Sequence, residues 1–124
     1  MNVVLWVLQG LLALAFLLSG GMKLLRPKES LESVMSWVED FSPGMIKLIG
    51  TVEILAALGL ILPAVTGIAT VLTPLAAVGL VLVMVGAAVT HGRRHEFPVV
   101  GINAVLLVLA AVVVWGRFGP YPLG

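Results

Sequence analysis

Residues 45–62 read MIKLIGTVEILAALGLIL, an apolar run that carries a single carboxylate, Glu53. At a rise of about 1.5 Å per residue, about 20 such residues form a helix long enough to cross a hydrocarbon core of about 30 Å. Three further apolar segments of similar length lie at residues 3–22, 67–90 and 98–116. The sequence therefore predicts an all-α membrane protein, a four-transmembrane-helix bundle that forms one domain over residues 1–124.

The composition excludes several other classes of protein. Of the 124 residues, 60% are hydrophobic and 10% are charged, against about 45–50% and about 25% in soluble domains. The chain has no cysteine, which rules out disulfides, thiolate metal sites, iron–sulfur clusters and CxxC redox chemistry carried by this chain. Neither a basic run for nucleic acid nor a nucleotide-binding or hydrolase motif is present.

The basic residues predict how the chain crosses the membrane. Six of the seven flank the loop between the first two spans or the loop between the last two, namely Lys23, Arg26, Lys28, Lys47, Arg93 and Arg94. Only Arg117 belongs to the opposite side. By the positive-inside rule, we expect both charged loops in the cytoplasm and both termini outside. The first span is expected to be retained, because no basic residue precedes it and it is longer than the apolar part of a secretion signal.

The long first loop is expected to contain a helix of its own. Apolar residues recur there at helical spacing, at Leu31, Val34, Met35, Val38 and Phe41. Pro27 suits the first turn of a helix, and Pro43 with the following glycine suits a stop. The pattern predicts a short amphipathic interfacial helix between helices 1 and 2.

Two prolines predict local features of the middle spans. A short turn from Pro63 to Thr66 is expected to join the second span to the third. Pro74 is expected to kink the third span and to free a backbone carbonyl one turn earlier, for the hydroxyl of Thr70 or Thr73.

Each span contributes one polar residue in its cytoplasmic half: Lys23, Glu53, His91 and Asn103. This arrangement is typical of a single polar site inside a bundle, and we predict that these residues bind a ligand. Ser19 lies one turn before Lys23 on the same helix face and is expected to line the same pocket.

Glu53 and His91 are the candidate catalytic residues. A carboxylate in hydrocarbon must be paired, most simply with Lys23 or His91, or must carry a proton. The alternative for Glu53 is that its pair with Lys23 only fixes helix register. His91 either shuttles protons or caps its helix at the interface, and Asn103 either binds a ligand or bonds to a neighbouring helix.

A metal site is not expected. His91 and His95 form an HxxxH spacing, but a metal ion would need further ligands.

Four passages resemble the DoxX-like family of small bacterial membrane proteins with four helices. They are LALAFLLSGGMKLLRP (12–27), WVEDFSPGMIKLIGTVEILAALGLILP (37–63), LTPLAAVGLVLVMVGAAVTH (72–91) and NAVLLVLA (103–110). The passage at 37–63 is the most specific of them. In this resemblance, Lys23, Glu53 and His91 look like the family's recurrent polar positions.

The resemblance implies a location and a functional context. It implies the bacterial inner membrane, and relatives are associated with a thiosulfate:quinone oxidoreductase or with assemblies that respond to oxidative stress. By analogy, this chain is expected to be a small subunit of, or accessory to, a membrane oxidoreductase, with an oxidoreductase partner protein and quinone as ligand. It is open whether the chain is itself catalytic. The alternatives are a non-catalytic membrane scaffold and a small proton-coupled carrier that works as a homo-oligomer.

Overall fold

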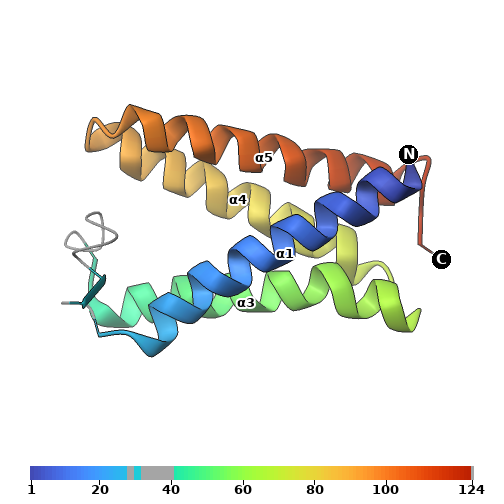
Figure 1. Ribbon diagram of the computed structural model, residues 1–124, viewed down its shortest axis with the longest axis horizontal. Coiled ribbons are helices and arrows are strands. Elements are labelled where there is room, and N and C mark those ends of the chain that lie inside the picture. Colours follow the sequence, from blue (N-terminus) through green and yellow to red (C-terminus); the bar gives the residue numbers. More distant parts are fainter. Residues whose placement is uncertain (28–29, 32–40, 124) are drawn as a thin grey trace.

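Four long helices form one bundle in the computed structural model, in which the structure describes residues 1–27, 30–31 and 41–123 (Figure 1). With the labels of Figure 1, the helices are α1 (Asn2–Leu25), α3 (Pro43–Thr66), α4 (Leu72–Arg93) and α5 (Phe97–Phe118). Each of the four is long and apolar enough to cross a membrane. The predicted all-α, four-helix membrane architecture is confirmed.

The outer surface of the bundle is apolar. Large side chains such as Val3, Leu55 and Leu82 are each more than 60% exposed along the lengths of their helices. Water would not tolerate so much exposed apolar area on a small domain, whereas lipid solvates it. The chain is therefore a multi-pass membrane protein.

The helices associate as two pairs. α1 packs along α3 and α4 packs along α5, while α3 also contacts α4 and α1 meets α5 over a shorter stretch. Figure 1 shows α1 beside α5 near the chain termini and beside α3 at the other end. We call the end with both termini the terminus end, and the end where α1 and α4 finish the charged end. Between them lies an apolar core that includes Leu12, Leu60, Leu80, Ala110 and Val113.

The turn between α3 and α4 differs from the predicted one. Pro63 lies inside α3, which continues to Thr66 and ends where Gly67 adopts a left-handed conformation with φ of 71°. Proline has no N–H to bond the carbonyl four residues earlier, here that of Gly59. The hydroxyl of Thr73 on α4 donates to that carbonyl at 2.9 Å. This bond compensates the interior proline, so the helix is able to continue past it.

The predicted kink at Pro74 is wrong. α4 begins at Leu72 rather than at residue 67, so Pro74 lies in its first turn. Backbone N–H groups in a first helical turn have no partner within the helix, so a proline there removes no hydrogen bond. The carbonyl that accepts from Thr73 is freed by Pro63 instead.

The predicted interfacial helix falls mostly on residues 28–29 and 32–40, outside the described residues, and stays a prediction. The described residues beside that segment pack onto the bundle. Leu31 is fully buried with Ile46, and Met22 and Phe41 pack against this pair.

Candidate functional site

A close contact between two glycines fixes the position of α1 on α3. A Cβ atom on Gly20 would lie 2.7 Å from the carbonyl oxygen of Gly50, and one on Gly50 would lie 2.8 Å from the Cβ of Lys23. Small residues let helix backbones approach closely in lipid, and at these distances neither position has room for a Cβ atom. The contact brings the last turns of α1 against the first turns of α3.

Lys23 and Glu53 form a buried ion pair beside this contact. The Lys23 Nζ donates to Oε1 of Glu53 and, at 2.8 Å, to the hydroxyl of Ser19. The side chains of Lys23 and Glu53 are only 7% and 2% exposed. Of the two partners predicted for Glu53, the structure selects Lys23.

His91 lies across the bundle at the end of α4 and pairs with a different carboxylate. Its Nδ1 is 2.9 Å from Oε1 of Glu96, which also accepts a hydrogen bond of 3.3 Å from Nε of Arg94. Glu96 precedes α5 as its N-cap residue. The sequence reasoning missed Glu96, although it lies only five residues after His91 in the chain.

Asn103 on α5 presents a buried amide with an unused donor. The residue is 7% exposed, and its Nδ2 has no hydrogen-bond partner within the described part of the chain. A buried donor without a partner costs about 1–3 kcal/mol. The predicted alternative, a hydrogen bond to a neighbouring helix, is not made by this nitrogen.

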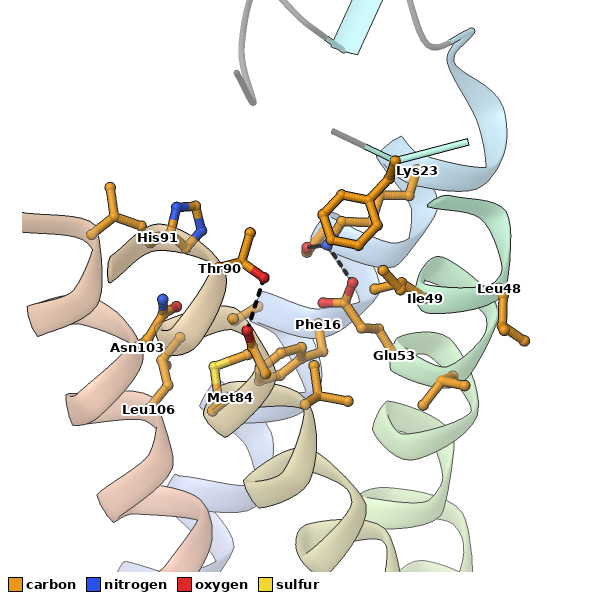
Figure 2. A pocket seen from close by; sticks show the side chains of 18 of the residues that line it. Phe16, Lys23, Leu48, Ile49, Glu53, Met84, Thr90, His91, Asn103 and Leu106 are labelled. Carbon is orange, nitrogen blue, oxygen red and sulfur yellow. Dashed lines mark hydrogen bonds and ion pairs between the residues drawn. The ribbon is translucent and has the colours of Figure 1, made fainter. Parts of the chain in front are cut away.

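All five predicted residues line one cavity of about 580 Å³. Ser19, Lys23, Glu53, His91 and Asn103 share it with Thr90 and Glu96, and most of the remaining lining is apolar. Figure 2 shows the polar groups in two sets that face each other across the cavity. Lys23 and Glu53 lie on one side, and His91 and Asn103 lie on the other.

This arrangement suits an apolar molecule with a hydrogen-bond acceptor. Ligand cavities of about 300–1,000 Å³ typically combine apolar walls with a few placed polar groups. The cavity offers the Asn103 donor and two carboxylates, each of which is already ion-paired or hydrogen-bonded. Within the described ranges, no three His, Cys, Asp or Glu side chains are grouped as metal ligands.

A second polar cluster, which the sequence reasoning missed, lies at the terminus end. Arg117 is only 3% exposed. Its Nε donates to Oε1 of Gln9 at 2.8 Å, and its Nη1 donates to Oδ1 of Asn2 at 2.6 Å and to the carbonyl of Tyr121 at 3.0 Å. The amide nitrogen of Gln9 donates in turn to the carbonyl of Leu60 at 2.7 Å. These bonds tie α5, α1 and α3 together.

A sequence signal for this second cluster did exist. Asn2 and Gln9 are seven residues apart, so they share one face of α1. Gln9 sits within the buried stripe of that helix, between Leu5 and Leu12. A buried amide requires a partner, and Arg117 is the only basic residue that the sequence assigns to that side.

The extent of the family match decides the classification. A family model described as the DoxX-like family matches residues 7–113. The chain belongs to the DoxX-like family. The matched range of this DoxX-like protein contains the five predicted site residues, whereas Asn2 and Arg117 lie outside it. No curated protein and no solved structure matches the chain.

Proposed function

We propose that this DoxX-like protein binds a quinone-like molecule in the cavity, as a small subunit of, or accessory to, a membrane oxidoreductase. The observation that carries the proposal is the unpartnered amide nitrogen of Asn103 in a largely apolar cavity. A quinone carbonyl is an acceptor on a flat apolar ring. It would satisfy this donor while the ring contacts the apolar walls.

Both sides of the cavity carry groups that suit the protons that accompany quinone chemistry. A quinone carries electrons and protons between membrane partners. Glu53 and Glu96 are carboxylates on the cavity wall, and each has a basic group within hydrogen-bond distance, Lys23 and His91 respectively. Such pairs hold or release a proton at the site with little movement. Because the chain has no cysteine, the proposal assigns the electron donor or acceptor to a partner protein.

The test is a binding measurement with the purified protein in lipid nanodiscs. A ubiquinone analogue without a tail is added, and bound analogue is quantified against empty nanodiscs. Asn103→Leu should weaken binding about tenfold, the effect of losing about 1.4 kcal/mol. Because this change removes a buried unpaired donor, unfolding should occur at the same temperature or higher.

The control substitution is Thr51→Val, on the exposed side of α3. It should leave binding unchanged. If Asn103→Leu binds the analogue as the wild type does, the proposal fails. If the leucine variant instead unfolds earlier, Asn103 has a structural role.

The proposal puts the charged end on the cytoplasmic side of a bacterial inner membrane. The support is the charge distribution, because the sequence places six of the seven basic residues in or beside the two loops at that end, whereas the seventh, Arg117, is buried and donates a hydrogen bond to Gln9. Single cysteines at His95 and Pro120, both exposed, test it in a chain without native cysteine. In intact cells, an impermeant maleimide should label Pro120→Cys and leave His95→Cys unlabelled. The reverse pattern would contradict this orientation.

A further inference from the structure

α3 and α4 touch closely near the terminus end. A Cβ atom on Gly59 would lie 2.8 Å from the Cβ of Ala76. The hydrogen bond from Thr73 to the Gly59 carbonyl is made at the same level. At this depth no space remains between the two helices.

Two helical turns toward the charged end, the same faces have separated. Val52 is seven residues before Gly59 and Val83 is seven residues after Ala76, so in these antiparallel helices the two valines lie on the faces that meet at Gly59 and Ala76. Both valines line the cavity, yet Val52 is 38% exposed. α3 and α4 therefore diverge toward the charged end, and a gap opens between them.

The rim of this gap between α3 and α4 lies on the lipid-facing surface of the bundle. Leu48, one turn beyond Val52, lines the cavity and is 56% exposed. On α4, Gly86 also lines the cavity, and a Cβ atom added there would meet nothing within 4 Å. Side chains that both line a cavity and contact the surroundings mark its opening. Because this surface belongs to membrane-spanning helices, the opening leads into the bilayer.

The polarity of the cavity lining also changes along the bundle. Polar residues lie toward the charged end, whereas Phe16, Met84 and Leu106 lie deeper (Figure 2). A ligand that satisfies both regions has its polar head toward the charged end and its apolar part toward the bilayer centre. This is the orientation that an amphiphile already has in a membrane.

We propose that the ligand is a carbonyl-headed amphiphile with a long hydrocarbon tail, which enters sideways from the bilayer between α3 and α4 and leaves its tail in that gap. We call the gap between Leu48, Val52, Val83 and Gly86 the lateral portal. This inference rests on the proposed function, because it assumes that the cavity binds a carbonyl head. It adds the hydrocarbon tail of the ligand, its route of entry and the position of the tail in the bound state.

Two quinones with the same head group test the inference, one without a tail and one with a long polyprenyl tail. A closed cavity of about 580 Å³ would exclude the long tail, whereas a lateral portal admits it. Wild-type protein in nanodiscs should bind both, when affinity is expressed per mole fraction in the membrane. Gly86→Phe fills the rim of the portal, so it should weaken binding of the tailed quinone about tenfold. Binding of the tailless quinone should weaken less than binding of the tailed quinone, because the tail lies in the portal and the head group lies deeper in the cavity.

Gly79→Phe is the matched control. Gly79 lies two turns before Gly86 on nearly the same face of α4, outside the cavity lining, and an added Cβ there also meets nothing within 4 Å. It should bind both quinones as the wild type does. If the wild type binds the tailless quinone but not the tailed one, or if Gly86→Phe affects both equally, the lateral portal is refuted while the proposed function stands. If the wild type binds neither, the proposed function itself fails.

Discussion

Lys23 of α1 and Glu53 of α3 form an ion pair inside the bundle, one turn from the place where Gly20 and Gly50 bring the two helix backbones together. The ammonium also donates to Ser19, so two of its hydrogen bonds are made within the protein. A buried charge with its partner removed is far more costly than the same position made apolar. The pair therefore fixes the register of α1 on α3 and places a carboxylate on the cavity wall.

The pair predicts a strongly non-additive double-mutant cycle. Lys23→Met or Glu53→Met alone should lower the free energy of unfolding by about 3 kcal/mol, because each leaves one buried charge without its partner. The double variant should lose less than either single variant. The free energy of unfolding is measured in mixed detergent micelles for the wild type, the two single variants and the double variant. A double variant whose loss equals the sum of the two single losses would show that the residues do not interact.

The glycine contact predicts opposite effects for two adjacent residues. Gly20→Ala places a Cβ 2.7 Å from the Gly50 carbonyl, so the helices must move apart, at a cost of about 1–3 kcal/mol. Gly21→Ala meets nothing within 4 Å and should be neutral or stabilising by up to about 1 kcal/mol, because alanine favours the helix. The same unfolding measurement compares them. Equal stability of the two variants would contradict the close contact.

The bond from Thr73 to Gly59 predicts rescue by a second substitution. Thr73→Val keeps the shape and removes the hydroxyl, which leaves the Gly59 carbonyl unpaired and should cost about 1–3 kcal/mol. Pro63→Ala supplies an N–H to that carbonyl from within α3, so Thr73→Val should cost much less in that background. Thr51→Val, which loses only an exposed bond within its own helix, is the control. If Thr73→Val costs the same stability in the wild type and in the Pro63→Ala background, Pro63 is not the reason for the bond.

Arg117 predicts a structural role distinct from ligand binding. Arg117→Lys cannot reproduce the planar set of bonds to Gln9, Asn2 and the Tyr121 carbonyl, and should lower the free energy of unfolding by about 2 kcal/mol. Arg93→Lys, on the exposed end of α4, should change it by less than about 0.5 kcal/mol. Both variants should bind a tailless quinone as the wild type does. A binding defect with unchanged stability in Arg117→Lys would place this cluster in the functional site.

The span count and the depth of the polar residues were predictable because both depend on distance along the chain. Apolar length sets the number of spans, and the rise per residue sets how deep Glu53 or Asn103 lies. Helix rotation depends on packing between helices, which no single span encodes. The sequence therefore left two partners open for Glu53 and did not anticipate the pairing of His91 with Glu96.

The ends of α3 and α4 were harder to predict because prolines have different effects at different helix positions. In the sequence, Pro63 indicates the start of a turn, but in the structure the Thr73 hydroxyl of the next helix bonds the carbonyl that Pro63 leaves without a donor. In the sequence, Pro74 indicates a kink inside the third span, but it lies in the first turn of α4. The sequence around Arg117 indicates only its side of the membrane, because its burial depends on amides more than a hundred residues away in the chain.

The most direct test is purification of the protein from its own membrane in mild detergent, followed by mass spectrometry of every lipid-soluble molecule and protein that remains bound. Three forms should be compared: wild type, Asn103→Leu, and Gly101→Leu, a control on the same helix where an added Cβ meets nothing within 4 Å. We expect a quinone and an oxidoreductase partner with the wild type and with Gly101→Leu, and loss of the quinone from Asn103→Leu. A wild type without quinone, or equal quinone in all three forms, would contradict this expectation.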